Sequence, residues 1–303
     1  MYFHSNNSRS PTENNPSALV PAGSAGKVII AGAGPGDPEL ISIKAAKALQ
    51  QADIILSDKL VSRDILENYV SPKAKVIFVG RTSKKGATTH QKTINDLMIQ
   101  YARAGKNVVR LKGGDVSVFS NILDELQTLI EQNIRYELIP GISAALGAAA
   151  YTGIPLTARN YASAVRFLTY NKVDPGHEHY WRDLAQTDDT LVFYMSAENI
   201  DIVVELLKKN QITSDKYIAV VEQATTSNQF VSVAPIHQHK IQFQDIRFSS
   251  PTLIIIGKVV ALHEQFAWLR NSQTHEPYFG DRERESERER ETETERERVE
   301  EEG

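Results

Sequence analysis

Short apolar runs alternate with helical patterns along the first half of the chain. The runs KVIIAGA, ADIILS, AKVIFVG, KNVVRLKG and RYELIPG are separated by stretches whose apolar residues have helical spacing, among them PELISIKAAKALQQ. Parallel strands need long crossover connections, which are usually helices. The alternation, which begins at Lys27, therefore predicts an α/β fold with a mostly parallel sheet covered by helices on both faces.

The second half of the chain has a different pattern. The small-residue stretch ISAALGAAAYTG predicts a helix that ends at Gly153, before Pro155. The strand-like runs AVRFLTYN, DTLVFYMS, KYIAVVEQAT, QFVSVAPI and PTLIIIGKVV follow it, with helices predicted only over NIDIVVELLKKN and LHEQFAWLR. Because strand-like runs that follow one another directly favour hairpins, we expect a mixed sheet here.

These patterns predict four parts. Residues 1–26 are rich in Ser, Asn, Pro and Gly and indicate a flexible leader. We expect an N-terminal α/β domain over residues 27–141, a C-terminal α/β domain over 142–271, and a charged low-complexity tail over 272–303. An interaction arm is one interpretation of the tail, and a solvated appendage is the favoured one.

The composition argues against several classes of function. Residues 281–303 hold 12 acids and 6 arginines and therefore carry a net charge of −6. The whole chain carries −4, so the net charge of the remainder is near +2. Such a weak positive charge disfavours nucleic acid binding. No apolar run approaches the roughly 20 residues that span a bilayer. Because the chain also has no cysteine and no secretory signal pattern, we expect a cytoplasmic protein without a membrane partner.

A glycine-rich turn, AGAGPGDPEL, lies between the first predicted strand and a helical run. Gly32 and Gly34 fit the dinucleotide-binding spacing, but Asp37 stands at the third glycine position and Pro35 removes a backbone N–H. An acid at this place would repel a phosphate, whereas it would tolerate a cation. Pro38 is also typical of a first helical turn, so a capped helix after a tight turn is the alternative.

Small and polar residues follow other predicted strands. Gly113 and Gly114 would let the backbone approach a ligand closely, and Asp115 could accept hydrogen bonds from it, with a type II turn as the alternative. Ser143 begins the small-residue helix as a cap or a contact, and Met195 ends a strand as core filler or a contact. Open α/β sheets bind ligands at the carboxyl ends of their strands, so these positions predict a ligand site.

Charged residues near the same strand ends are candidates for chemistry. Asp58 follows the second predicted strand, where it can act as a base or cap the next helix. Arg81, Lys84 and Lys85 lie in a long polar loop, which is typical of a substrate wall or of a solvated loop. No pair of histidines has the spacing of metal ligands, so we expect no metal site.

Several motifs occur in one order along about residues 27–269: GAGPGDPELIS, VVRLKGGD, IPGISAA, AAAYTGIPLT, TLVFYM and SPTLIIIGKVVAL. In this order they resemble the uroporphyrinogen-III C-methyltransferases of the tetrapyrrole methylase superfamily. The resemblance implies two α/β domains with the active site in the cleft between them, and a homodimer. It implies S-adenosyl-L-methionine as methyl donor, released as S-adenosyl-L-homocysteine. The implied reaction methylates uroporphyrinogen III twice on carbon and gives precorrin-2, a precursor of siroheme and cobalamin.

The resemblance also implies roles for particular residues. Asp58 matches the family's proposed proton acceptor. Arg81 stands where the family has a proposed lysine donor, and because arginine gives up protons poorly we interpret it as electrostatic. Arg159 matches an arginine suited to bind the carboxylates of the tetrapyrrole. The implied cofactor-binding residues are Pro35, Gly113, Gly114, Asp115, Val118, Ser143, Ala144, Met195 and Ala224.

One segment departs from the family pattern. Where the family has GGDPFIFGRGGEE, residues 113–125 of this chain read GGDVSVFSNILDE. Asn121 thus replaces an arginine that is thought to contact substrate or assist catalysis. Two alternatives to the implied reaction follow: a methylase for another precorrin-like tetrapyrrole, or a catalytically weak protein that binds S-adenosylmethionine or a tetrapyrrole.

Overall fold

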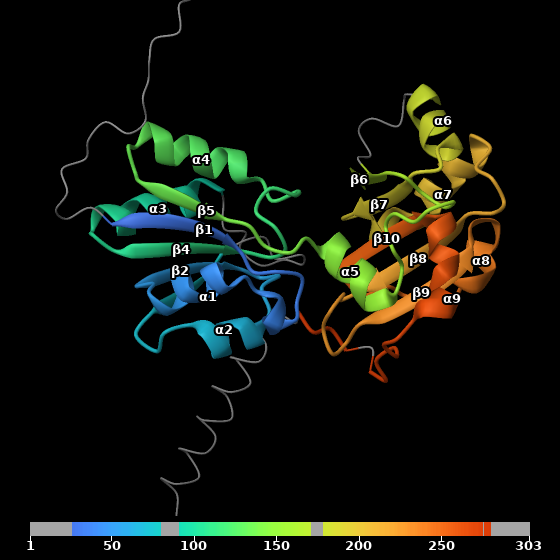
Figure 1. The fold of residues 1–303 in the computed structure, drawn as a ribbon. Coiled ribbons are helices and arrows are strands. Elements are labelled where there is room, and N and C mark those ends of the chain that lie inside the picture. The colour runs from blue at the N-terminus through green and yellow to red at the C-terminus, as the bar shows by residue number, and fades with distance from the viewer. Residues whose placement is uncertain (1–25, 80–90, 171–177, 275, 280–303) are drawn as a thin grey trace, which may run out of the picture.

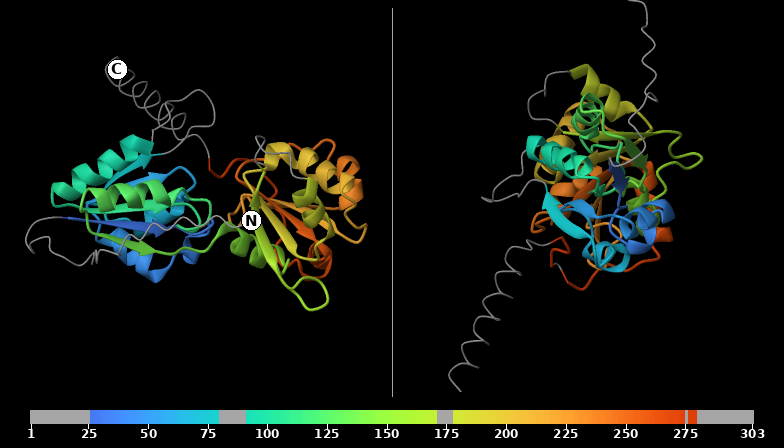
Figure 2. Two further views of the ribbon diagram at one scale, coloured as in Figure 1. Left: turned by 90° about the horizontal axis from the view of Figure 1, so that it is seen from above. Right: turned by 90° about the vertical axis from the view of Figure 1, so that its left-hand side faces the viewer.

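A computed structural model describes residues 26–79, 91–170, 178–274 and 276–279 of the chain. Two five-stranded sheets lie side by side, and helix α5 (Ala144–Thr152) lies at the junction between them (Figure 1). Seen from above in Figure 2, the two halves are joined where the chain leaves the first sheet. The expectation of one mostly parallel and one mixed α/β sheet is confirmed.

The first sheet has the order β3-β2-β4-β1-β5, and all of its strand pairs are parallel. Its strands are β1 (Lys27–Gly32), β2 (Ile54–Asp58), β3 (Lys75–Val79), β4 (Asn107–Lys112) and β5 (Tyr136–Ile139). The register sets Gly32 of β1 opposite Lys112 of β4, and Ala31 opposite Ile139 of β5. The loops that follow these three strands therefore begin at the same level, at one edge of the sheet.

Helices cover both faces of this sheet, as expected for strands that are apolar along their whole length. Helices α1 (Ile43–Gln50) and α2 (Arg63–Tyr69) lie on one face, and α3 (Gln91–Arg103) and α4 (Ile122–Glu131) on the other (Figure 1). Successive strand residues point to opposite faces. Ile29 thus packs in the core with α1, whereas Ile30 packs in the core with α3.

The helix predicted over PELISIKAAKALQQ is interrupted. A 3-10 turn, η1 (Pro38–Leu40), comes first, and α1 begins only at Ile43. The reason is local capping: Ser42 has extended backbone, and its hydroxyl accepts a hydrogen bond of 3.2 Å from the amide of Ala45. A serine that caps a helix lies outside it, so the run divides at this residue.

The second sheet has the order β6-β7-β10-β8-β9. Its strands are β6 (Val165–Thr169), β7 (Thr190–Tyr194), β8 (Tyr217–Glu222), β9 (Phe230–Pro235) and β10 (Thr252–Gly257). Strands β6 and β7 are parallel, and the other pairs are antiparallel. The register sets the end of β7 beside the start of β10, and the start of β10 beside the end of β8.

Two layers also cover the second sheet. Helix α5 packs on one face, and α6 (Glu178–Gln186) and α7 (Ile200–Lys209) pack on the other. Three short elements also occur on the side of α6 and α7: η2 (Ala197–Asn199), η3 (Ile236–Gln238) and α8 (His239–Gln242). Helix α6 was not predicted, although Trp181, Leu184 and Ala185 recur at helical spacing and are buried.

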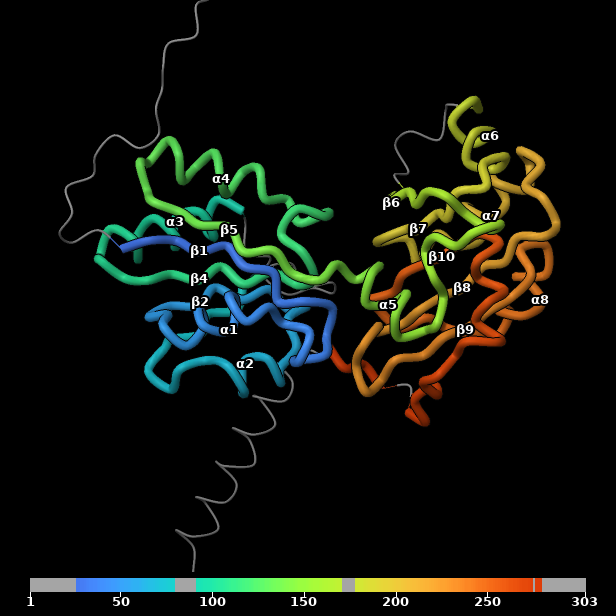
Figure 3. The backbone as a smooth tube through the Cα atoms, viewed as in Figure 1, coloured from blue at the N-terminus to red at the C-terminus, as the bar shows by residue number. Residues whose placement is uncertain are grey.

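The final helix is shorter than predicted. The run LHEQFAWLR forms the end of η4 (Lys258–Leu262) and α9 (His263–Phe266), after which Ala267 is extended. The indole N–H of Trp268 donates a hydrogen bond of 2.8 Å to the carbonyl of Ala150, which draws the chain away from the helical path. The tube in Figure 3 shows the chain path from β5 through α5 into the second sheet. In the described part of the chain, no helix is long and apolar enough to cross a membrane.

Candidate functional site

Three glycine-containing loops cross closely at the edge of the first sheet. Gly34 and Gly114 exchange two backbone hydrogen bonds, of 3.1 and 2.8 Å. A β-carbon on Gly32 would lie 2.6 Å from the carbonyl oxygen of Gly114, and one on Gly141 would lie 2.3 Å from the same oxygen. These distances are far shorter than a normal van der Waals contact. Glycine at these two positions therefore allows the backbone of the neighbouring loop to lie this close.

The two glycines after β4 differ in their surroundings: Gly113 packs against Leu60, whereas Gly114 leaves space for a ligand. A β-carbon on Gly113 would lie 3.0 Å from the carbonyl oxygen of Leu60. Gly114 has φ 69°, a conformation that favours glycine, and the nearest atom to an added β-carbon is 3.8 Å away, on Ala144. Of these two glycines, Gly114 is therefore the one that faces open space.

Asp37 has the capping role that was the alternative interpretation of its loop. One of its oxygens accepts a hydrogen bond of 2.8 Å from the amide of Glu39, and the other accepts one from the hydroxyl of Tyr151. Its own amide donates to the hydroxyl of Thr225, at 3.1 Å. Asp37 therefore caps η1 and joins the two halves, and it is Pro35 from this loop that reaches the cavity described next.

A cavity of about 230 Å³ lies between the two halves. Its walls come from the loops after β1, β2, β4 and β5 on one side, and from the end of β7, the loop after β8 and the start of β10 on the other. All nine positions predicted to bind the cofactor line it. The complete lining is Pro35, Leu60, Gly113, Gly114, Asp115, Val118, Phe119, Ser143, Ala144, Tyr194, Met195, Ala224, Ser250, Pro251, Thr252, Leu253 and Phe279.

Asp115 is the only charged side chain among the described residues of this lining. It accepts hydrogen bonds of 2.8 Å from the amide of Ser117 and 3.0 Å from the amide of Gly141. Partial burial alone would raise the pKa of Asp115, but the bonds from Ser117 and Gly141 outweigh it and hold the pKa below its ordinary value. The cavity therefore carries one negative charge at neutral pH.

Aromatic residues that the sequence analysis did not single out complete the wall. The hydroxyl of Tyr194 shares a hydrogen bond of 2.6 Å with Ser143 and accepts one of 3.1 Å from the amide of Ala145. Its ring lies 4.9 Å from that of Phe119, between centroids. Ser143 thus fixes Tyr194 and makes no side-chain bond to its own helix. The sequence feature that could have identified Tyr194 as a site residue is its position beside Met195, at the end of a strand.

Met195 is not core filler. It is 69% exposed and has φ 52°, a left-handed conformation that is rare for a residue with a β-carbon. Backbone strain of this kind is found most often at functional sites. Its place in the cavity lining is consistent with a contact to a ligand.

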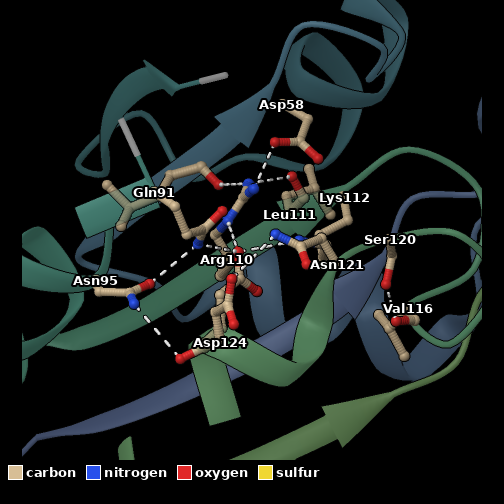
Figure 4. Close-up of polar contacts among 12 residues, drawn as sticks. Asp58, Gln91, Asn95, Arg110, Leu111, Lys112, Val116, Ser120, Asn121 and Asp124 are labelled. Carbon is tan, nitrogen blue, oxygen red and sulfur yellow. Dashed lines mark hydrogen bonds and ion pairs between the residues drawn. The ribbon is translucent and has the colours of Figure 1, made fainter. Parts of the chain in front are cut away.

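Asp58 belongs to a buried cluster of charges beneath the site (Figure 4). Its Oδ1 pairs with Nη2 of Arg110 at 2.5 Å, and Nε of Arg110 pairs with Oε1 of Glu125 at 3.0 Å. Lys112 pairs with the same oxygen of Glu125 at 2.9 Å. Arg110 and Lys112 are two apart on β4, so both point to the face that α4 covers.

Glu125 is the centre of this cluster. It is fully buried, and Arg110 and Lys112 are nearly so. Burial lowers the pKa of Lys112, and the charge of Arg110 lowers it further, while Glu125 and Asp58 oppose both effects. Within the described residues, Oε2 of Glu125 is buried without a hydrogen-bond partner. Two buried cations therefore depend on a single buried carboxylate.

The segment that departs from the family pattern leads from the cavity into α4. Val116 is buried in the core, and the hydroxyl of Ser120 donates to its carbonyl. Asn121 has φ 52° at the start of α4, is exposed, and makes a long bond of 3.4 Å to Asp124 (Figure 4). Asparagine suits this left-handed position.

The remaining predicted residues lie elsewhere. Arg159 is exposed and lines a different hollow, beside Tyr161 and Asp188, so it is not part of the cavity wall. Arg81 lies outside the described residues. Among the residues that the structure describes, no cluster of His, Asp or Glu could hold a metal ion.

Comparison with known proteins identifies the family. The model of the Tetrapyrrole (Corrin/Porphyrin) Methylases matches residues 27–239. The siroheme synthase of Thioalkalivibrio sulfidiphilus is 40% identical over 250 residues, which are 82% of this chain and 51% of the relative. That of Acinetobacter baylyi is 41% identical over 244 residues, 80% of this chain and 53% of the relative. The chain thus spans about half the length of these relatives.

Solved structures agree with this assignment. A uroporphyrin-III C-methyltransferase from Thermus thermophilus superimposes with a TM-score of 0.66 at 28% identity, covering 81% of this chain and 98% of that one. A cobalt precorrin-4 methyltransferase superimposes with a TM-score of 0.70 at 27% identity, over 80% of this chain and 99% of that one. The chain belongs to the tetrapyrrole methylases.

Proposed function

We propose that this protein transfers methyl groups from S-adenosyl-L-methionine to two carbons of uroporphyrinogen III and forms precorrin-2. The observation that carries the proposal is that all nine expected cofactor positions line one cavity. The similarity to siroheme synthases and to a uroporphyrin-III C-methyltransferase supports it. A further Thermus thermophilus structure, 30% identical with a TM-score of 0.64 over 78% of this chain and 100% of that one, contains S-adenyl homocysteine.

The cavity suits a cationic nucleoside better than a dinucleotide. Its lining is mainly apolar and contains one carboxylate, that of Asp115, and no basic side chain among the described residues. A pyrophosphate would meet a negative charge there, whereas a sulfonium would be attracted to it. When bound, S-adenosylmethionine supplies an activated methyl group. The residues around it then bind and orient the two reactants, which can provide much of the rate.

We propose Asp58 as the group that accepts the proton released after the new carbon–carbon bond forms. Its Oδ1 is held by Arg110, and its side chain is 26% exposed. This exposed fraction lets the carboxylate meet a substrate proton. Arg110 thereby acts as a positioning residue for the carboxylate.

The tetrapyrrole carries eight carboxylates, which require cationic partners. We propose Arg159 for this role because it is exposed. We propose Arg81 as a catalytic residue that acts electrostatically, because its guanidinium stays charged. A substrate this large extends beyond a cavity of about 230 Å³, so contacts at a separate hollow are compatible with it. Asn121 lacks the charge of the family's arginine, and a methylase for another precorrin-like tetrapyrrole is therefore the second candidate.

Incubation of the purified chain with S-adenosylmethionine and uroporphyrinogen III under reducing, anaerobic conditions tests the function. We expect a product with two added methyl groups, measured by mass spectrometry, and two molecules of S-adenosylhomocysteine for each molecule of this product. Methylation of a precorrin substrate alone would establish the second candidate. Binding of S-adenosylhomocysteine without any methyl transfer would contradict both and indicate a binding protein.

Replacing Asp58 with asparagine tests the proposed proton acceptor. The carboxamide keeps the volume but accepts a proton far less readily, so we expect methyl transfer to fall by about a hundredfold or more. The affinity for S-adenosylhomocysteine, measured by calorimetry, should stay within about twofold because Asp58 does not line the cavity. Asp96→Asn, at an exposed position of α3, is the matched control. Unchanged methylation in Asp58→Asn would remove Asp58 from this role.

We also propose a homodimer, with precorrin-2 passing to siroheme or cobalamin synthesis in the cytoplasm. Several large apolar side chains are exposed on the single chain, among them Ile43, Leu123 and Leu146, and a second copy could cover them. Light scattering of the purified protein measures the mass directly.

A further inference from the structure

A short segment beyond the family-matched residues returns to the cleft. We call residues 276–279 the strap. In Figure 1 the red C-terminal part of the described chain runs between the two halves. The family model matches residues 27–239, and the strap lies outside this match. Its last described residue, Phe279, lines the cavity.

One end of the strap is anchored to the second half. The side chain of Gln223 donates a hydrogen bond of 3.1 Å to the carbonyl of Glu276, and its oxygen accepts one from the amide of Tyr278. Asn228 donates a second bond of 2.9 Å to the same carbonyl. Gln223 is buried and immediately precedes Ala224 in the cavity wall. The backbone of the strap is thus fixed beside that wall.

The other anchor is on the first half. The hydroxyl of Tyr278 lies 2.6 Å from the hydroxyl of Ser62 and donates a bond of 2.7 Å to Asp64 at the start of α2. Burial raises the pKa of Tyr278 to about 12, and the bond to Asp64 contributes, so the hydroxyl stays protonated as a donor near neutral pH. Ser62 lies two residues after Leu60, which lines the opposite wall.

The two anchors hold the strap at the rim of the cavity. Ser62, Asp64, Gln223 and Tyr278 do not line it, whereas Phe279 does. The arrangement joins the two walls by hydrogen bonds and presents one aromatic ring to the space between them. A segment in this position can contribute binding area without filling the site with its backbone.

We propose that the strap is part of the methyl-donor site, in which Tyr278 ties the two halves together and Phe279 forms a wall against the bound nucleoside. This inference rests on the proposed function, because it takes the cavity as the cofactor site. It assigns a binding role to residues that the sequence analysis placed in a charged tail. It also predicts that the strap becomes more ordered when the site is filled.

Calorimetry of the full-length protein with S-adenosylhomocysteine tests the strap. We expect Phe279→Ala to weaken binding by about tenfold, the size of one well-buried apolar contact. Tyr278→Phe removes both bonds to the first half and should weaken binding by about fivefold. Phe266→Ala, at an exposed aromatic outside the cavity, is the matched control and should bind like the wild type. In turnover assays, the KM for the methyl donor should rise in both strap variants while kcat changes little.

The outcomes separate the strap from the proposed function. Wild-type affinity in both Phe279→Ala and Tyr278→Phe, when the wild type itself binds, would overturn the strap and leave the proposed function intact. Failure of the wild type to bind S-adenosylhomocysteine at all would overturn both. As a second measurement, we expect hydrogen exchange at the amide of Tyr278, which bonds to Gln223, to slow when S-adenosylhomocysteine is added. Equal exchange with and without it would contradict the proposal.

Discussion

Replacing Gly141 with alanine should destabilise the fold and abolish tight binding of S-adenosylhomocysteine. The new β-carbon would lie 2.3 Å from the carbonyl oxygen of Gly114 and 2.9 Å from the backbone of Gly32. All of these atoms are main chain, so no side chain can turn away. We expect the free energy of unfolding to fall by about 3 kcal/mol, at the upper end for overpacking. Urea unfolding and calorimetry measure the two effects.

Gly105→Ala is the control for this prediction. Gly105 has φ 75° in an exposed turn outside the cavity, so alanine there meets only the backbone strain of a left-handed conformation. That strain costs about 1 kcal/mol and should leave the affinity for S-adenosylhomocysteine unchanged. An unfolding free energy of Gly141→Ala equal to that of the wild type would show that the three loops do not cross as described.

Replacing Glu125 with glutamine should have the second large effect. The substitution keeps the shape of the side chain but removes a carboxylate that pairs with two buried cations. Among the described residues, Arg110 then keeps its ion pair with Asp58, whereas Lys112 loses the one it has. Removing one partner of a buried ion pair typically costs about 3–5 kcal/mol, because the remaining charge is uncompensated. We expect a loss of this size in the free energy of unfolding, and reduced methyl transfer because Arg110 positions Asp58.

Two variants check the origin of this loss. Glu131→Gln changes an exposed acid on the same helix and should alter the free energy of unfolding by less than about 0.5 kcal/mol. The double variant Glu125→Gln with Lys112→Met removes one cation together with the anion. It should be more stable than Glu125→Gln alone, since fewer buried charges are left unpaired. Equal stability of single and double variants would contradict the charge account.

Much of the architecture could be predicted from the sequence because it depends on local patterns. Continuous apolar runs indicated the strands of the first sheet, and directly successive runs indicated a mixed second sheet. The family and the fold class are confirmed. The predicted helix bounds that were wrong depended on single residues. Ser42 caps α1 and so divides the first predicted helix, and the hydrogen bond from Trp268 to Ala150 ends the last predicted helix early.

The site was only partly predictable. The nine predicted cofactor positions lie near strand ends, which sequence patterns can locate. They line one cavity, which supports their predicted roles, and these roles stay predictions. The capping role of Asp37 was one of the two interpretations of its motif, whereas its bond to Tyr151 could not be predicted because it joins residues that are distant in the sequence. Phe279 could not be found at all, since no local pattern shows that the strap returns to the cleft.

A crystal structure of the protein with S-adenosylhomocysteine bound tests the central claim most directly. The account predicts the nucleoside in the cavity between the two sheets, in contact with Gly114, Asp115 and Ala144 and with Phe279, which also lines this cavity. Binding at a different place, such as the hollow beside Glu198 and Arg247, would contradict it.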